Sequence, residues 1–368
     1  MRFPEFSEEW ESTPISTIAD IIGGGTPDTS VDEYWGGNIQ WFTPSEIGKE
    51  KYAYLSDRTI TEAGLKNSSA KLLPQGTVLL STRATIGECS IATAECTTNQ
   101  GFQSLVAKKN NVSSEFLYYI VAKIKREMLR RSCGSTFLEI SANELKKIHA
   151  NIPSKAEQEK LVSLLSLIDQ RIETQKKIIE DLKKLKDAIR TKLFRYIENT
   201  YTAYDEIRNM LDYEQPTEYL VNSTEYSDSY QTPVLTANKA FILGYTDELH
   251  GIYDKGDCII LDDFTMDVKY VTFPFKVKSS AIKILTAKQN VDLYYMYEYI
   301  MHLALVSEEH KRHYISEIEP MNITCPPLQE QKQISLMLKS LNMLVDNAKN
   351  YQGLLSKQKQ YLLTQLFI

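Results

Sequence analysis

The sequence contains few of the residues that mark fibrous, disordered or disulfide-stabilised proteins. Its 368 residues include 15 glycines and 12 prolines, too few for a collagen-like or low-complexity chain. The five cysteines form no Cys-x-x-Cys pair, which indicates neither a disulfide framework nor a zinc site. No apolar run approaches the ~20 residues of a membrane span, and the acidic N-terminus lacks the apolar core of a signal sequence. We therefore expect a soluble, intracellular protein of two or three domains, with no membrane association.

Acidic residues outnumber basic ones, and the two are unevenly distributed. The net charge of −6 argues mildly against a simple nucleic-acid binder, which usually carries a basic surplus. Residues 155–195 hold 11 basic and 7 acidic residues, and residues 326–368 hold 5 and 2. The longer segments before them are acidic, above all residues 196–325, with 10 basic and 21 acidic residues. Two basic segments of similar length each follow an acidic one, which indicates a duplication.

A comparison of the chain with itself supports this duplication. Residues 151–195 align without a gap on residues 324–368, 173 positions later, and share Pro-x-x-x-Glu-Gln at their start and Leu-Phe at their end. The match is weaker upstream, where GTVLLS at 76–81 resembles GDCIIL at 256–261. The sequence therefore predicts the order globular, helix, globular, helix.

Each repeated basic segment is predicted to form one long helix with an apolar seam. Apolar residues recur at alternating steps of three and four, the pattern of a coiled coil, and polar residues such as Gln175 and Lys186 fill the gaps. Ser154-x-x-Glu157 has the form of a capping box, and Pro326-Pro327 marks the second helix start. The alternative is two helices that pack independently. The predicted seam consists of Ile168, Ile172, Ile179, Leu182, Ile189 and Leu193, with Leu341, Val345, Ala348, Leu355, Leu362 and Leu366.

The duplication also predicts the architecture. Tandem copies that associate through the same helix face favour a pseudo-two-fold arrangement, in which the helices run antiparallel. Short apolar runs bounded by Gly, Pro and Asp predict β-rich globular segments. We therefore expect an α+β fold in which two similar β-rich domains, residues 1–152 and 201–325, are held apart by an antiparallel coiled coil of residues 153–200 and 326–368. Such a device suits the reading of two half-sites on a duplex.

Longer motifs resemble a known protein family. The first globular segment contains GGGTPDTSVDEYWGGNIQWFTPSEIGK, STRATIGECSIA and TTNQGFQSL, and the second contains QTPVLTANKAFILGYTDE and LDDFTMDVKYVTFPFKVKSSAIKIL. The helix entries IPSKAEQEKL and CPPLQEQKQI repeat one pattern. Over essentially its whole length, the chain resembles the specificity subunit of a type I restriction–modification enzyme. The second segment departs from the first in lacking a Gly-Gly-Thr-Pro loop.

The resemblance implies a non-catalytic, bipartite reader of double-stranded DNA with one target recognition domain for each half-site. It also implies that two methyltransferase subunits, which bind S-adenosylmethionine and methylate adenine N6, dock on the chain. Restriction–translocase subunits, which use ATP and Mg, would join for cleavage. The chain itself would hold no cofactor and work in the bacterial or archaeal cytoplasm at the nucleoid.

Polar loops between the predicted strands supply the candidate DNA contacts, because Arg and Lys bind guanine or phosphate and Asn and Gln bind adenine. Any soluble surface carries such residues, so loop polarity alone is a weak indicator. For the first half-site the candidates are Lys49, Ser81, Arg83, Thr85, Asn99, Gln100 and Ser135. For the second they are Thr236, Asn238, Lys239, Phe264, Lys269, Lys278 and Arg312.

The sequence gives only weak indications of a phosphate loop, a metal site or a nuclease site. The glycines at 23–25 are followed by no Gly-Lys-Ser/Thr, so a turn near DNA backbone is favoured over a phosphate loop. His310-x-x-His313 lacks further ligands for a metal, and Asp262-Asp263 lacks nuclease spacing. We predict no catalytic or metal-binding residue. Two alternatives remain open: a coiled-coil scaffold whose modules bind protein, and an enzyme in its own right.

Overall fold

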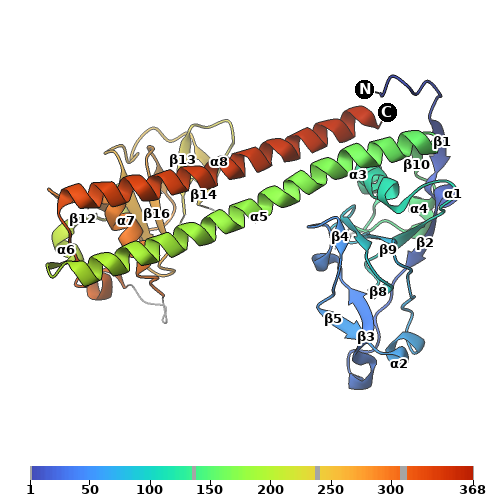
Figure 1. Ribbon diagram of the computed structural model, residues 1–368, viewed down its shortest axis with the longest axis horizontal. Helices are drawn as coiled ribbons and strands as arrows, with labels where there is room; N and C mark the ends of the chain where they lie inside the picture. The colour runs from blue at the N-terminus through green and yellow to red at the C-terminus, as the bar shows by residue number, and fades with distance from the viewer. Residues whose placement is uncertain (1, 135–137, 237–240, 307–312, 368) are drawn as a thin grey trace. The chain divides into compact units, whose positions relative to one another are not determined.

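The computed structural model describes residues 2–134, 138–236, 241–306 and 313–367. It contains two compact units, the first made of Met1–Lys176 with Asn350–Ile368 and the second of Lys177–Lys349. Two long helices, α5 (Lys155–Thr200) and α8 (Leu328–Leu366), each contribute to both units (Figure 1). Each unit therefore combines one β-rich module with part of each helix. Among the described residues, no helix is long and apolar enough to cross a membrane.

The module of the first unit contains three sheets. A five-stranded sheet has the order β2-β9-β6-β7-β4, a three-stranded sheet has the order β5-β3-β8, and β1 pairs with β10. Pairing is antiparallel except for β4 with β7 and β3 with β8. The strands are β1 (Glu11–Pro14), β2 (Ala19–Gly23), β3 (Trp35–Phe42), β4 (Tyr52–Ala53), β5 (Arg58–Ile60), β6 (Val78–Leu80), β7 (Cys89–Ala92), β8 (Cys96–Thr98), β9 (Gln103–Ala107) and β10 (His149–Ile152). The helices are α1 (Ile15–Ile18), α2 (Glu62–Lys66), α3 (Ser114–Arg131) and α4 (Ala142–Lys146), with 3-10 turns at Asp32–Tyr34 and Pro44–Glu46.

The module of the second unit has a closely similar plan. Its sheets have the orders β12-β18-β15-β16 and β14-β13-β17, and β11 pairs with β19. The strands are β11 (Tyr204–Glu206), β12 (Leu211–Glu214), β13 (Thr232–Leu235), β14 (Ile242–Thr246), β15 (Cys258–Asp262), β16 (Val268–Val271), β17 (Lys276–Val277), β18 (Ile282–Ala287) and β19 (Asn322–Thr324). The helices are α6 (Ile207–Met210) and α7 (Leu293–His302), with a 3-10 turn at Pro216–Tyr219 and a π-helical turn at Tyr314–Ile318.

The two modules share one topology. Each begins with a strand, a single helical turn and a second strand, β1-α1-β2 in one and β11-α6-β12 in the other. The antiparallel pair β6–β7 corresponds to β15–β16, and the parallel pair β3–β8 corresponds to β13–β17. One helix then packs on the large sheet, α3 in the first module and α7 in the second. The duplication predicted from the sequence is therefore present in the topology.

Local chemistry explains where α3 and α7 begin and which face they bury. The Ser113 hydroxyl accepts from the Phe116 N–H at 3.1 Å, and the Asp292 carboxylate accepts from the Tyr295 N–H at 2.9 Å. Both are N-caps, which satisfy backbone donors that the first turn leaves free. Beyond the caps, Phe116 and Tyr295 are fully buried in the cores of their modules.

Within each unit, the two long helices pack against each other. In the first unit, Leu161 and Leu165 near the start of α5 share a core with Leu366 and Phe367 at the end of α8. In the second, Phe194 near the end of α5 shares a core with residues near the start of α8, Ile334 and Leu338. The start of one helix thus meets the end of the other, so the helices run antiparallel. All twelve predicted seam residues are buried or half-buried.

One local detail differs from the expectation. Glu157, predicted as part of a capping box, is buried, and its carboxylate accepts hydrogen bonds from the side chains of Arg2 at 2.8 and 2.9 Å and Trp10 at 3.2 Å. Two residues more than 140 positions away thus engage the carboxylate that the local pattern assigned to the helix start. The contact fixes the N-terminal segment against α5.

A polar contact ties each module to the long helices. In the first unit, the Tyr119 hydroxyl on α3 donates to the Asp169 carboxylate on α5 at 2.6 Å, and Lys359 on α8 pairs with Asp169 at 2.6 Å. In the second unit, the Glu298 carboxylate on α7 pairs with Lys186 at 2.9 Å and Arg190 at 2.8 Å, both on α5. These contacts hold the modules at defined positions on the helices.

Candidate DNA interface

Two neighbouring loops form a platform in the first module. The β6–β7 loop, residues 81–88, is closed by the Ser81 hydroxyl, which lies 3.1 Å from the Arg83 carbonyl and 2.9 Å from the Thr85 hydroxyl. The Thr82 N–H donates to the carbonyl of Gly101 at 2.9 Å and so joins this loop to the β8–β9 loop, residues 99–102. The Ile140 N–H donates to the Thr82 carbonyl at 3.0 Å, which attaches the segment after α3.

The second module builds the same platform from other residues. The Asp262 carboxylate closes the β15–β16 loop, residues 263–267, by accepting from the N–H groups of Phe264 at 2.8 Å and Thr265 at 2.7 Å. The Asp263 N–H donates to the Ala281 carbonyl at 3.1 Å and so joins the β17–β18 loop, residues 278–281. The Asp263 carboxylate accepts from the N–H groups of His313 and Tyr314 at 2.9 and 2.7 Å, which attaches the segment after α7.

The hydrogen bonds align the first three residues of the β6–β7 and β15–β16 loops, although the loops differ in length. Ser81 and Asp262 each follow the last paired position before the loop and close it, and Thr82 and Asp263 each reach the neighbouring loop. Arg83 and Phe264 are each the third residue after the last paired residue before the loop, which is Leu80 in the first module and Leu261 in the second. Each loop also holds one non-glycine residue in the left-handed region, Ala84 with φ 62° and Met266 with φ 59°, a conformation that surrounding contacts must support.

The two adjacent aspartates of the second module have structural roles. Asp263 and Lys283 are almost completely buried and form an ion pair at 3.2 Å, and Lys283 also donates to the Tyr213 hydroxyl at 3.1 Å. Together with its two backbone donors, this pair satisfies the Asp263 carboxylate. In the part of the chain that the structure describes, no group of three or more His, Cys, Asp or Glu is placed to hold a metal ion.

The structure brings most first-module candidates together on the platform. Arg83, Thr85 and Gln100 are exposed on the two loops. Asn99 is half-buried, and its side-chain carbonyl accepts from the Gly101 N–H at 2.8 Å. Ser81 is fully buried, so its hydroxyl shapes the loop and presents no group to a ligand.

Lys49 and Ser135 stand apart from this group. The Lys49 carbonyl accepts from Nζ of Lys176 on α5 at 3.5 Å, so this exposed lysine lies toward the helix. Ser135 lies outside the described residues.

In the second module, Phe264 lies in the β15–β16 loop with 39% of its surface exposed. Lys278 is exposed on the neighbouring loop, with its Nζ 5.8 Å from the centre of the Tyr226 ring, and Lys269 is exposed on β16. Thr236 is half-buried at the end of β13, where its N–H donates to the Phe241 carbonyl at 3.2 Å. The candidates Asn238, Lys239 and Arg312 lie outside the described residues.

The glycine run at residues 23–25 packs against the β8–β9 loop of the first platform. A Cβ on Gly24 would lie 2.1 Å from the Asn99 carbonyl oxygen, so only glycine fits this backbone approach. The Thr26 hydroxyl donates to the Gln100 side chain at 2.5 Å. Gly23 is the last residue of β2, and Gly24 and Gly25 follow it in irregular backbone, so the predicted turn does not lie at the glycines. The Thr26 contact ties this segment to the loop that carries Gln100. Sequence reasoning missed Arg58, whose guanidinium lies 3.6 Å from the centre of the Trp35 ring.

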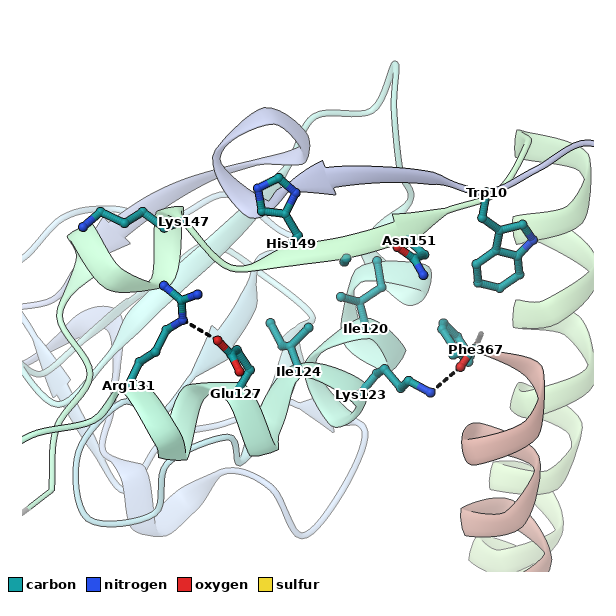
Figure 2. A pocket seen from close by; sticks show the side chains of 11 residues that line it. Trp10, Ile120, Lys123, Ile124, Glu127, Arg131, Lys147, His149, Asn151 and Phe367 are labelled. Carbon is teal, nitrogen blue, oxygen red and sulfur yellow. Dashed lines mark hydrogen bonds and ion pairs between the residues drawn. The ribbon is translucent and has the colours of Figure 1, made fainter.

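A separate pocket of about 350 Å³ lies between α3 and β10 of the first unit (Figure 2). Two of its basic side chains are engaged by other lining residues: Arg131 pairs with the Glu127 carboxylate at 2.5 Å, and Nζ of Lys123 donates to the Phe367 carbonyl. The hydrogen bond that the Arg131 guanidinium donates to the Glu127 carboxylate raises the pKa of Arg131. Sequence reasoning missed this basic surface. Its lining residues include Trp10, Ile120, Lys123, Ile124, Glu127, Arg131, Lys147 and His149.

Comparison with known proteins agrees with this geometry. A family model, the type I restriction modification DNA specificity domain, matches residues 7–184 and 206–352, one match for each module. The chain belongs to this family. The earlier resemblance to specificity subunits is therefore confirmed.

Individual relatives carry the same description. The chain is 42% identical over 182 residues to the type I restriction enzyme MjaIX specificity subunit of Methanocaldococcus jannaschii, covering 48% of this chain and 42% of that protein. It is 44% identical over 139 residues to the EcoR124I/EcoR124II specificity subunit of Escherichia coli, covering 36% and 34%. The matches thus span less than half of the length of each of these relatives.

Solved structures establish the fold. The S subunit of a type I restriction–modification system from M. genitalium superposes with a TM-score of 0.60 and 16% identity, covering 100% of this chain and 99% of that one. A second solved chain, from a study of the complex assembly of a type I R-M system, gives 0.61 and 13%, covering 99% and 98%. These specificity-subunit likenesses confirm the predicted α+β fold of two similar modules and two long helices.

Proposed function

We propose that this chain is the DNA-recognition subunit of a type I restriction–modification complex and reads a bipartite target, one module for each half-site. The observation that carries the proposal is the repeated two-loop platform, because a duplicated reader needs two equivalent surfaces that differ in side-chain chemistry. In this proposal the chain itself catalyses no reaction. Its relatives are named specificity subunits.

We further propose that methyltransferase subunits dock on the long helices. In the second unit, α8 exposes Leu336, Met337, Met343 and Leu344, each with 46–66% of its surface in solvent. The two pairs are seven positions apart, so they form one stripe on the helix, and an exposed apolar stripe marks a protein interface. In this complex the methyltransferase binds S-adenosylmethionine, and the restriction subunits use ATP and Mg.

Docking can be tested with a charge placed in the stripe. Leu344→Glu should abolish co-purification with the methyltransferase subunit, whereas Lys349→Glu, which places the same side chain at an exposed position on another face of α8, should not. Both variants should keep the circular dichroism spectrum of the parent chain. Unchanged co-purification of Leu344→Glu would exclude this stripe as the docking surface.

The acidity of the second module predicts weak DNA binding by the isolated chain. Residues 196–325 hold 10 basic and 21 acidic residues, and phosphate neutralisation supplies much of the affinity of DNA-binding proteins. We propose that the methyltransferase subunits complete the clamp. Tight, sequence-specific binding by the isolated chain at ~0.15 M salt would refute this division of labour.

Methylation mapping tests the proposed function directly. The chain is co-expressed with its methyltransferase subunit, and N6-methyladenine is located across the genome by long-read sequencing. A single interrupted motif that appears only with this chain is expected. Methylation without the chain, or none despite a stable complex, would favour a protein-binding scaffold.

Modularity predicts that Arg83→Ala changes recognition or occupancy at one half-site only. Arg83 is exposed on the platform, and a good bidentate contact contributes about 1–3 kcal/mol of discrimination. Lys109→Ala is the matched control, because this exposed lysine follows β9, which carries the chain away from the platform. Equal losses at both half-sites by folded Arg83→Ala would contradict modular reading.

A further inference from the structure

The two platforms present opposite chemistry at their equivalent third position. The last paired residues before and after each loop are Leu80 with Cys89 and Leu261 with Val268. Counting from Leu80 and Leu261, the third residue is Arg83 in one module and Phe264 in the other. Both are partly accessible, with 45% of the Arg83 side chain and 39% of Phe264 exposed.

These two side chains cannot make the same contact with a base pair. The arginine guanidinium carries five N–H donors, whereas phenylalanine offers only an apolar ring. The Phe264 N–H is also committed, since it donates to the Asp262 carboxylate at 2.8 Å. In the major groove, the apolar feature that distinguishes one base pair from another is the C5 methyl group of thymine.

The burial of Phe264 favours a surface contact over insertion between base pairs. About three-fifths of its surface is covered by the protein, so the side chain offers part of its ring and does not stand clear of the loop. The loop itself is held by two hydrogen bonds to Asp262 and by the Asp263–Lys283 ion pair. A rigid ring that is partly buried in its loop can pack against a methyl group. A side chain that inserts between base pairs must instead project far enough to separate the stacked bases.

We propose that the two half-sites are read by different chemistry and that Phe264 contacts a thymine methyl group in the second half-site. This inference rests on the proposed function. Such an apolar contact does not depend on attraction to phosphate, so the acidic composition of the second module does not weaken it. Arg83 supplies a hydrogen-bonding or charged contact at the matching place in the first half-site.

The test uses the full chain with its methyltransferase subunit and duplexes that carry the mapped target. Each thymine of the second half-site is replaced in turn by deoxyuridine, which removes only the methyl group. For the parent chain, one replacement should raise Kd about fourfold, the factor that corresponds to about 0.8 kcal/mol for one buried methyl-sized group. Phe264→Ala should bind both duplexes equally, whereas Phe264→Leu, which remains apolar, should still distinguish them.

Controls separate this inference from the proposed function. Deoxyuridine in the first half-site should affect the parent and Phe264→Ala alike. Phe264→Ala should also leave the dependence of Kd on salt unchanged, because the residue neutralises no phosphate. Absence of any sequence-specific binding by the parent complex would refute the proposed function instead.

Four results would overturn the inference while leaving bipartite recognition intact. They are a second half-site without A·T pairs, a parent complex indifferent to every deoxyuridine, a Phe264→Ala complex that still distinguishes thymine from deoxyuridine, and a rise in 2-aminopurine fluorescence at a Phe264-dependent step. The last result would show base unstacking and therefore insertion of the ring.

Discussion

The buried carboxylate of Glu298 is a point at which a single substitution should strongly destabilise the second unit. It is fully buried on α7, pairs with Lys186 and Arg190 on α5, and accepts from the side-chain amide of Asn342 on α8 at 3.2 Å. Burial lowers the pKa of Lys186, and the Glu298 charge opposes that shift. Lys186 therefore depends on this carboxylate for its stability in the interior, and Arg190 is held by it together with Asp187 at 2.9 Å.

Glu298→Ala leaves the buried Lys186 without its acid and leaves Arg190 with its pair to Asp187 at 2.9 Å. Breaking a buried ion pair from one side costs about 3–5 kcal/mol, against a total free energy of unfolding of about 5–15 kcal/mol for a typical domain. For a unit of this size, each kcal/mol lowers Tm by about 2–4 °C. We therefore expect the Tm of this unit to fall by roughly 6–20 °C.

Calorimetry and urea denaturation of the full chain measure this effect. Asp346→Ala is the matched control, because it removes a carboxylate of the same unit from an exposed ion pair. Asp346 pairs with Lys349 at 2.9 Å, and both residues lie on α8. Exposed pairs contribute less than about 1 kcal/mol. If Glu298→Ala destabilised the protein no more than Asp346→Ala, the buried network would not hold α7 on the helices, and the reasoning would be refuted.

Three further predictions concern backbone fit, protonation and thiol access. Gly24→Ala should lower stability and first-half-site binding, because its Cβ would lie 2.1 Å from the Asn99 carbonyl oxygen. Gly353 has open space around it on α8, so Gly353→Ala should stabilise the chain by about 0.5–1 kcal/mol. Thermal melts that rank the two variants in the other order would contradict this. Burial lowers the pKa of His302 below its ordinary 6.5, so the unfolded chain binds more protons and the free energy of unfolding should fall as pH drops below about 6.5. Urea melts at pH 7.5 and 5.5 should show a smaller fall for His302→Gln, and an equal fall would rule out this contribution. Burial raises the pKa of the thiols of Cys89, Cys96 and Cys258 to about 12, while Cys133 is exposed. Titration of the native protein with dithionitrobenzoate should therefore show one fast-reacting thiol, which Cys133→Ser removes. A fast phase that persists in this variant would contradict the assignment to Cys133.

The long helices and the duplication were predictable because their signals are local or periodic. The heptad spacing from Ile168 to Leu193 and the identities 173 positions apart are visible in the sequence itself. The capping box at Ser154 was a local pattern as well, yet the Glu157 carboxylate is engaged by Arg2 and Trp10. The local pattern fails at Glu157 because its partners come from the N-terminal segment, more than 140 positions earlier in the chain. A contact between such distant residues leaves no local pattern in the sequence.

The candidate surface could be located from the sequence, but the roles within it could not. Loop polarity pointed to residues 81–88 and 262–269, and both became parts of the platforms. Which side chains face outward depends on bonds between distant residues, such as Thr82 to Gly101 and Asp263 to Tyr314. These bonds bury Ser81 and leave Arg83 exposed, although both are polar and two positions apart.

The polar contacts between modules and helices show how the two copies diverged while remaining foldable. Tyr119 and Glu298 occupy the same place, six residues after the N-caps of α3 and α7, and each faces its partner on a long helix, Asp169 or Asn342. Asp169 and Asn342 are repeat equivalents, 173 positions apart. The carboxylate therefore lies on the helix in one unit and on the module in the other, each time beside a lysine at the same repeat position, Lys359 or Lys186. Because a lysine held in such a site without an acid is costly, the two sides of this contact had to change together, and the result is one charge pattern built in two ways.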